Sequence, residues 1–267
     1  MSFQSQPPLK VMTPDLKAWF DSEVGRELLE AESALISRIL PTLFGYHLVQ
    51  IGVDSRICLY DESPVRNKFV VVPALALGLA DNCVVADSSE LPFEQHSVDV
   101  VILHHALDFA QSPHQVLREA ARILRPGGHM LVVGFNPSSL WGLYRRFKGK
   151  QPKAPWNGHF ISHRRLSDWF QLLELTELKR RSEYFLAPFE NEKWRKRCCV
   201  FERWGHRAFK ERGAFTLMLA RKDVAGMTPI KEERARGRLI NLPVAEPSVR
   251  GQISEGRSDL YRRRLQR

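Results

Sequence analysis

The chain has 267 residues, 43% of them hydrophobic, which is enough apolar material for one α/β domain with extensions. Its formal net charge is +10, but the basic excess lies after residue 140, whereas the first 140 residues carry a net negative charge. Because the four cysteines form no CxxC pair, no apolar run approaches a membrane span and the N-terminus lacks a signal-peptide pattern, we expect a cytoplasmic protein without a disulfide framework, a bound metal or membrane contact.

The N-terminal residues predict a flexible arm followed by a helix. Residues 1–14 contain three prolines and end in a helix start, where Thr13 can cap and Pro14 fits the first helical position. Apolar residues then recur at helical spacing as far as residue 39, and Pro41 ends the pattern. We therefore expect an amphipathic helix that packs on the domain or covers it as a lid.

Short buried strands follow and alternate with helices. The strand-like runs are 47–51, closing on Gly52, then 69–72, 83–86, 98–103, 129–135, 178–186 and 214–220. Helices are expected at 113–124, opened by Ser112 and stopped by the turn 125–128, and at 162–175. This alternation predicts an α/β, Rossmann-like fold with a doubly wound, mostly parallel sheet that binds its ligands above the carboxyl ends of the strands.

Three spaced segments in the middle of the chain resemble a known family. They are residues 86–93 (ADSSELPF), 97–103 (SVDVVIL) and 117–128 (LREAARILRPGG). In this order they resemble the second half of a class I methyltransferase domain of the small-molecule type 11 kind, which depends on S-adenosylmethionine (SAM). The resemblance implies SAM as the cofactor and a methyltransferase-like domain over residues 15–222, with its core at 44–136 and a basic cover and closing strands at 137–222. Residues 223–267 are rich in Arg, Glu, Pro and Ser and are expected to form a disordered basic tail.

The same resemblance implies roles for individual residues. Asp87 would accept a hydrogen bond from the exocyclic amine of adenine, and Ser88 would offer its backbone N–H to the ring. The alternative for Asp87 is a turn-forming residue after a strand. Leu103 ends the fourth predicted strand, and His104 and His105 follow at the lip where family members place cofactor and substrate contacts. Either histidine could contact SAM or act as a general base, and the alternative is a packed or solvent-facing side chain.

The first half of the domain departs from the family pattern. Residues 49–56 (VQIGVDSR) hold one glycine, Gly52, which would admit the methionine part of SAM, and Gln50 stands where an acid is usual. The second strand, ending in VVVP at 70–73, lacks the acid that would bind the ribose hydroxyls. The short spacing from Gly52 to Asp87 predicts that one helix is truncated or replaced by a loop around residues 54–67. Such a degenerate first half beside an intact second half is similar to the YafS-type methyltransferase-like proteins of gammaproteobacteria.

A basic stretch with aromatic residues follows the fifth strand. It includes Arg145, Arg146, Lys148, Lys150, Lys153, Trp156, Phe160, His163, Arg164 and Arg165, and a second basic cluster occupies residues 193–197. Arginine with aromatic residues suits phosphates and stacked bases, although a solvated amphipathic insertion fits the pattern equally well. Two functions therefore stand. The first is a methyltransferase acting on a small or anionic acceptor, and the alternative is a catalytically inactive methyltransferase fold that binds nucleic acid or a protein through its basic C-terminal half. No residue combination specifies the acceptor atom or the oligomeric state.

Overall fold

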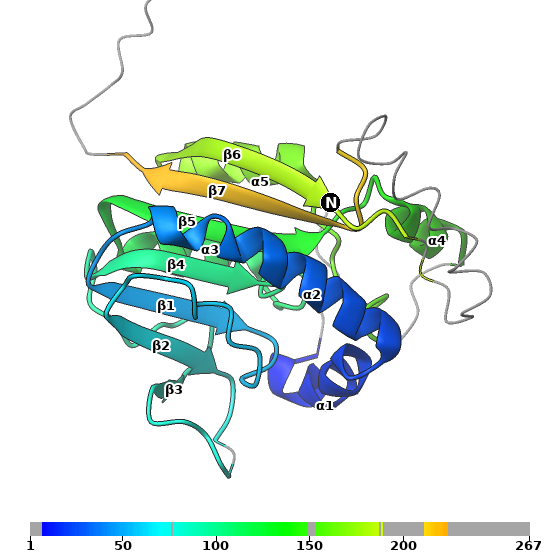
Figure 1. Ribbon diagram of the computed structural model, residues 1–267, viewed down its shortest axis with the longest axis horizontal. Helices are drawn as coiled ribbons and strands as arrows, with labels where there is room; N and C mark the ends of the chain where they lie inside the picture. The colour runs from blue at the N-terminus through cyan, green and yellow to red at the C-terminus, as the bar shows by residue number, and fades with distance from the viewer. Residues whose placement is uncertain (1–6, 76, 149–152, 187, 189–210, 224–267) are drawn as a thin grey trace, which may run out of the picture. The chain divides into compact units, whose positions relative to one another are not determined.

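Seven strands form one sheet in the order β3-β2-β1-β4-β5-β7-β6 (Figure 1). This computed structural model describes residues 7–75, 77–148, 153–186, 188 and 211–223. The strands are β1 (His47–Gly52), β2 (Asn67–Val72), β3 (Cys83–Val85), β4 (Val98–His104), β5 (Leu124–Phe135), β6 (Leu175–Glu183) and β7 (Phe215–Lys222). The first five are parallel, and β7 runs antiparallel between β5 and β6. The predicted Rossmann-like, mostly parallel sheet is confirmed.

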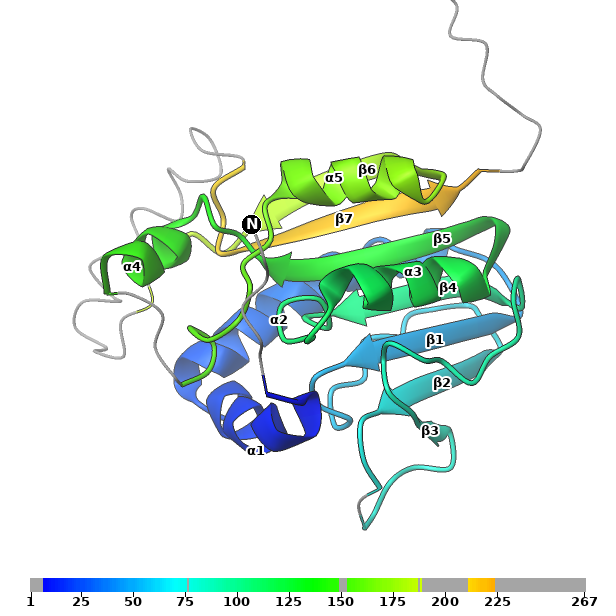
Figure 2. The same cartoon turned by 180° about the vertical axis from the view of Figure 1, so that it is seen from behind.

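Helices cover the two faces of the sheet unequally. They are α1 (Leu9–Phe20), α2 (Glu23–Ser37), the short 3₁₀ helix η1 (Leu40–Thr42), α3 (Pro113–Ile123), α4 (Leu140–Lys148) and α5 (His163–Leu172). Figures 1 and 2 show α2 on one face, α3 and α5 on the other, and α1 beyond the carboxyl ends of the parallel strands. None of the helices in the described part of the chain is long and apolar enough to cross a membrane.

Alternation along the strands divides the core between the two faces. On β4, Ile102 packs with the residues of α1 and α2, whereas Leu103 packs with those of α3 and α5. Because side chains of a strand alternate, His104 follows Ile102 toward α2. Asp99, near the start of β4, accepts hydrogen bonds from the backbone N–H groups of Tyr46 and His47, so its carboxylate has a structural role.

The connections in the first half of the sheet contain no helix. Residues 53–66 between β1 and β2 form turns, as do the described residues between β2 and β3. A parallel pair needs a crossover connection, which is usually helical. The loop expected near residues 54–67 is therefore present, and α1 and α2 pack on this side instead, with Val53, Ile57, Leu59 and Val65 in their core.

The N-terminal segment differs from its prediction in two ways. Helix α1 begins at Leu9, so Thr13 and Pro14 lie inside it, and the Thr13 hydroxyl donates to the carbonyl of Leu9 instead of capping. The sequence predicted one long helix here, whereas the structure has two. The second helix, α2, begins after Ser22, whose side chain caps it by accepting from the backbone N–H of Gly25. A Cβ on Gly25 would meet the carbonyl oxygen of Trp19 at 2.2 Å, so the close approach of α1 and α2 requires glycine there.

The second half follows its prediction more closely. Helix α3 and the strands β4 and β5 lie where they were expected, although β5 begins at Leu124 and includes the predicted turn. Helix α4 was not predicted, and β6 begins and ends three residues before its expected bounds. The basic cluster at 193–197 and the predicted tail after residue 223 lie outside the described residues.

Candidate active site at the carboxyl edge of β1 and β4

The order of the sheet fixes where a ligand of this fold binds. Strand β1 pairs with β2 on one side and β4 on the other, so the chain changes direction of winding between β1 and β4. Ligands of open α/β sheets bind in the crevice outside the carboxyl ends at this switch point. The two strands end here with Gly52 opposite His104.

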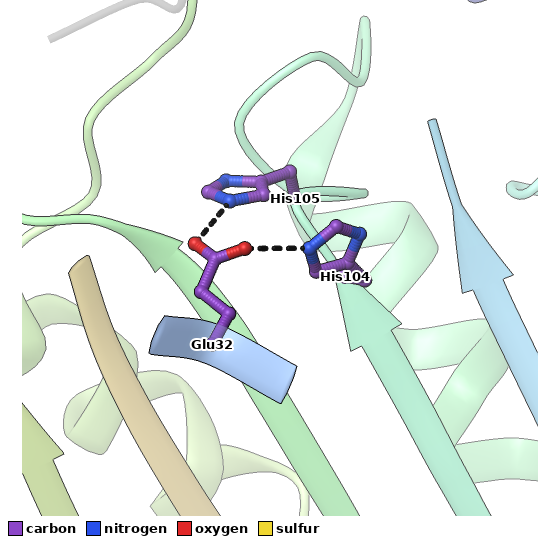
Figure 3. A group of neighbouring side chains, drawn as sticks. All are labelled: Glu32, His104 and His105. Carbon is purple, nitrogen blue, oxygen red and sulfur yellow. Dashed lines mark hydrogen bonds and ion pairs between the residues drawn. The ribbon is translucent and has the colours of Figure 1, made fainter. Parts of the chain in front are cut away.

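Three buried side chains meet at this edge. Glu32 of α2 lies between two imidazoles (Figure 3), and its carboxylate contacts His104 Nε2 at 2.9 Å and His105 Nε2 at 2.8 Å, each through a different oxygen. The side chains of Glu32, His104 and His105 are at most 1% exposed. Consecutive strand residues point to opposite faces, but His105 leaves the strand with φ 51°, which lets both rings reach Glu32.

Further groups hold the two histidine rings of this cluster in place. His105 Nδ1 lies 2.8 Å from Asp108 Oδ2, and the same oxygen accepts from the backbone N–H of Phe135 at 2.9 Å. Phe20 of α1 lies against both histidine rings, with centroid distances of 5.8 and 5.9 Å. His104 Nδ1 is buried without a hydrogen-bond partner among the described residues. The cluster is thus held from α1, α2, β4 and β5 together.

The charges of the cluster follow from its burial and contacts. Burial alone would raise the pKa of Glu32, but the charge of His105 and hydrogen bonds from both imidazoles outweigh it and lower that pKa to about 2. Burial lowers the pKa of His105, but the charge of Glu32 and the hydrogen bond to Asp108 raise it to about 9. Burial lowers the pKa of His104 more than the hydrogen bond to Glu32 raises it. At neutral pH the cluster therefore holds a carboxylate, an imidazolium and a neutral imidazole.

The segment after β1 is folded down onto the sheet. The buried Gln50 amide accepts from the backbone N–H of Leu59 and donates to the carbonyl of Ile57, which ties the loop to β1. Asp54 is 3% exposed, and Arg56 donates to both of its carboxylate oxygens. Asp54 is thus already paired, whereas Asp61 and Glu62 on the same connection are exposed.

The loop after β3 carries the predicted adenine contacts. Asp87 is exposed, and its Oδ1 accepts from the backbone N–H and the hydroxyl of Ser89, which is the turn alternative considered from the sequence. Ser88 is half-buried beside it. Leu91 is buried, and the Phe93 ring lies 5.9 Å from that of Phe69. The turn geometry leaves the predicted adenine contact untested.

The structure brings some of the predicted site residues together. Gly52, Leu103, His104 and His105 meet at the edge of β1 and β4, whereas Asp87 and Ser88 lie on the loop after β3. The catalytic role of the two histidines stays a prediction.

Glu32 and Asp108 belong to the cluster but were not among the site residues predicted from the sequence. Glu32 had a signal, because it shares the apolar helical face of Leu28, Leu35 and Ile36, where a charged residue needs a partner. Asp108 gave no signal of its own.

The basic stretch is only partly a surface feature. Arg145 donates to the carbonyl of Trp156, and its guanidinium lies 4.7 Å from the centroid of the Phe160 ring. Burial lowers the pKa of Arg145. Arg146 and Arg164 are exposed. One arginine of the basic stretch is therefore used within the fold. The nucleic-acid interface itself remains a prediction.

A cavity of about 330 Å³ opens where β6 ends and β7 begins. It is lined by His163, Arg180, Arg181, Ser182, Glu183, Phe185, Glu211 and Thr216. Thr216 pairs with Gly134 near the carboxyl end of β5, so the cavity lies at the same edge of the sheet as the histidine cluster. Its lining combines two arginines and a histidine with two glutamates and three uncharged residues, and Arg180 is paired with Glu211.

Comparison with known proteins identifies the family. Residues 55–132 match the model of a methyltransferase domain. Over 182 residues the chain is 31% identical to the protein YafS of Escherichia coli K12, covering 68% of this chain and 73% of YafS. It is also 28% identical to a malonyl-[acyl-carrier protein] O-methyltransferase of Hahella chejuensis, covering 51% of this chain and 50% of that protein.

Solved structures show the same fold. A SAM-dependent methyltransferase of Thermotoga maritima superimposes with a TM-score of 0.59 at 21% identity, covering 80% of this chain and 98% of that one. A SAM-dependent methyltransferase of Archaeoglobus fulgidus gives a TM-score of 0.52 at 15% identity, covering 73% of this chain and 94% of that one. At these identities the likeness concerns the fold alone.

Proposed function

This chain belongs to the class I SAM-dependent methyltransferase family, in its YafS-type branch, and we propose that it transfers the methyl group of SAM to a small or anionic acceptor. The proposal assigns the cofactor to the carboxyl edge of the sheet, with its adenine at residues 86–93 and its methionine part beside Gly52. The adjacency of Gly52 and His104 carries the proposal, because it makes the crevice between β1 and β4 the switch point of the sheet. The comparisons give no support to the inactive alternative.

The residues after β3 fit the adenine part of SAM. Asp87 uses Oδ1 within its own turn, and Oδ2 has no hydrogen bond among the described residues. This free oxygen can accept from the exocyclic amine of adenine, and we assign the backbone N–H of Ser88 to the ring. Leu91 and Phe93 supply apolar walls for a planar ligand.

The methionine part fits only if the N-terminal helices move. Gly52 is buried, and a Cβ added there would lie in ordinary van der Waals contact with Gln50 and His104 at 3.8 Å. Leu103 offers only its main chain, because its side chain packs toward α3. Phe20 and Glu32, however, cover His104 at this edge. We therefore propose that α1 and α2 act as a lid that moves away from the crevice when SAM binds.

Bound SAM supplies an electrophilic methyl group on a sulfonium. The protein then has to hold an acceptor in line with it and exclude water, which supplies much of the rate acceleration without a base. His104 and His105 remain our predicted groups for polarising the acceptor. Because Glu32 holds both rings in this structure, they reach an acceptor only in the open state of the lid.

Arg181 in the cavity between β6 and β7 supports the anionic class of acceptor. Arg181 and His163 line this cavity at the same edge of the sheet, and an arginine suits a carboxylate or phosphate. The relative from Hahella chejuensis is named for O-methylation of a malonyl group, which carries a carboxylate. We expect Arg181→Gln to raise KM for an anionic acceptor while leaving SAM affinity unchanged.

Calorimetric titration with SAM and S-adenosylhomocysteine tests the proposal. We expect binding in the micromolar range by the wild-type protein and its loss in Asp87→Ala. Asp81→Ala is the matched control, because Asp81 is also exposed and lies in the preceding connection. Absence of binding at millimolar ligand, or equal binding by both variants, would contradict the assignment of the adenine site.

A further inference from the structure

We infer that Glu32, His104 and His105 form a binding site for one divalent transition-metal ion, which fastens α2 to the carboxyl end of β4. The site consists of two imidazole nitrogens and a carboxylate that come from positions far apart in the sequence. Their ligand atoms all lie within 4.8 Å of one another (Figure 3). No CxxC or His-x-x-His spacing announces such a site, which is why the sequence predicted none.

The donor atoms of the two rings face a single carboxylate. Both rings present Nε2 to the same carboxylate, and each carboxylate oxygen faces a different ring. An ion seated between them would take the place of the hydrogen atoms that now join the three groups. Two imidazoles with one carboxylate form a donor set that suits Zn²⁺ and Fe²⁺ and that does not suit Ca²⁺ or Mg²⁺, which prefer oxygen ligands.

The surroundings have the features of a metal-ligand shell. A histidine that binds a metal usually donates its other ring nitrogen to a carboxylate or carbonyl, which fixes the ring. His105 makes this contact from Nδ1 to Asp108 at 2.8 Å, and the backbone N–H of Phe135 orients Asp108 in turn. Gly134 packs so closely that an added Cβ would lie 3.1 Å from Asp108 Oδ1. The second carboxylate is therefore held rigidly behind the ring.

Burial indicates what the ion would do. The three side chains are at most 1% exposed, and the Phe20 ring closes the cluster from α1. An enclosed ion bound by α2 and β4 would join the N-terminal helices to the sheet. It would also engage both imidazoles, so the metal-bound state and a catalytic role of the histidines exclude one another. The inference does not depend on the proposed methyl transfer.

Cobalt titration of the full-length chain, purified without a histidine tag and treated with a chelator, tests the site. We expect one Co²⁺ per chain, visible d–d absorption distinct from that of aqueous cobalt, and competition by Zn²⁺. Glu32→Gln and His105→Gln keep side-chain size and should abolish the absorption. Asp108→Asn should weaken binding about 10- to 100-fold, as loss of an outer-shell partner typically does.

The control is His114→Gln, because His114 is exposed on α3, which packs on the opposite face of the sheet. This variant should bind cobalt as the wild type does. A raised melting temperature of the wild type with Zn²⁺, lost in chelator, provides a readout that does not require the ligand variants to fold. No d–d absorption at millimolar cobalt, undiminished absorption in Glu32→Gln, or a thiolate-to-cobalt charge-transfer band that assigns the ion to cysteines would overturn the inference.

Discussion

The two halves of the sheet are built from the same kind of strand but covered in different ways. Between β4 and β5 the chain crosses back through α3, whose Leu117 and Ala120 are fully buried against the sheet. Between β1 and β2 it crosses back through a loop, and α1 and α2 pack on this side instead. A crossover helix can therefore be absent from this fold when another segment buries the same apolar face. In this chain the replacement also closes the crevice.

The largest expected effect tests whether α2 depends on its buried ion pair. Glu32→Ala leaves the imidazolium of His105 with Asp108 as its remaining partner, and removal of one member of a buried pair costs roughly 3–5 kcal/mol. Urea unfolding in the presence of a chelator, followed by circular dichroism, measures the free energy of unfolding. Glu30→Ala is the control, since Glu30 is exposed on the same helix. Equal losses in both variants would show that α2 is held by its apolar face alone.

A smaller effect is expected where the loop of the first half is tied to β1. Gln50→Glu keeps the acceptor for the backbone N–H of Leu59 but cannot donate to the carbonyl of Ile57 once ionised. A buried carbonyl without a donor and a buried carboxylate should together lower the free energy of unfolding by about 2–3 kcal/mol. The exposed Gln95 gives the control, Gln95→Glu. If Gln50→Glu left the free energy of unfolding unchanged, the loop would not depend on this amide. The acid that is usual in the family could then stand at this position without loss of stability.

An effect of about 1–2 kcal/mol is expected from Asp99→Ala, which tests the link between the halves. The Asp99 carboxylate accepts from two backbone N–H groups, those of Tyr46 and His47, and thus joins the start of β4 to that of β1. Thermal or urea unfolding measures the change, with Asp168→Ala at an exposed position as the control. A loss no larger than that of the control would mean that water replaces the carboxylate at this edge.

The second half of the sheet could be predicted from the sequence because its signals are local. The runs at 98–103 and 129–135 are apolar on both faces, and Ser112 with Pro113 marks the start of α3, so period and helix-start residues agree with the final structure. The ribbon-level fold was therefore predictable. Helix α1 was displaced from its prediction because Pro14 was assigned to a helix start, whereas the chain accommodates it inside a helix that begins at Leu9.

Of the candidate site, only the residues at the end of β4 could be predicted from the sequence. His104 and His105 follow a strand, and their position at the carboxyl edge comes from the fold. Glu32, which contacts both rings, lies 72 positions before His104 in the chain. No spacing rule connects residues that far apart, and only the placement of α2 across the sheet brings the carboxylate between the rings. The burial of both histidines under that helix followed from the same placement.

The smallest expected effect comes from the helix-free connection between β2 and β3. Leu77 is 106% exposed, so Leu77→Ala removes no buried surface and should change the free energy of unfolding by no more than about 0.5 kcal/mol. Leu117→Ala on α3 makes the same chemical change at a fully buried position and should cost about 2–5 kcal/mol. Urea unfolding of the two variants compares the connections directly. A cost for Leu77→Ala near that for Leu117→Ala would mean that Leu77 is covered in solution, and the first half would then bury apolar surface that the described residues leave exposed.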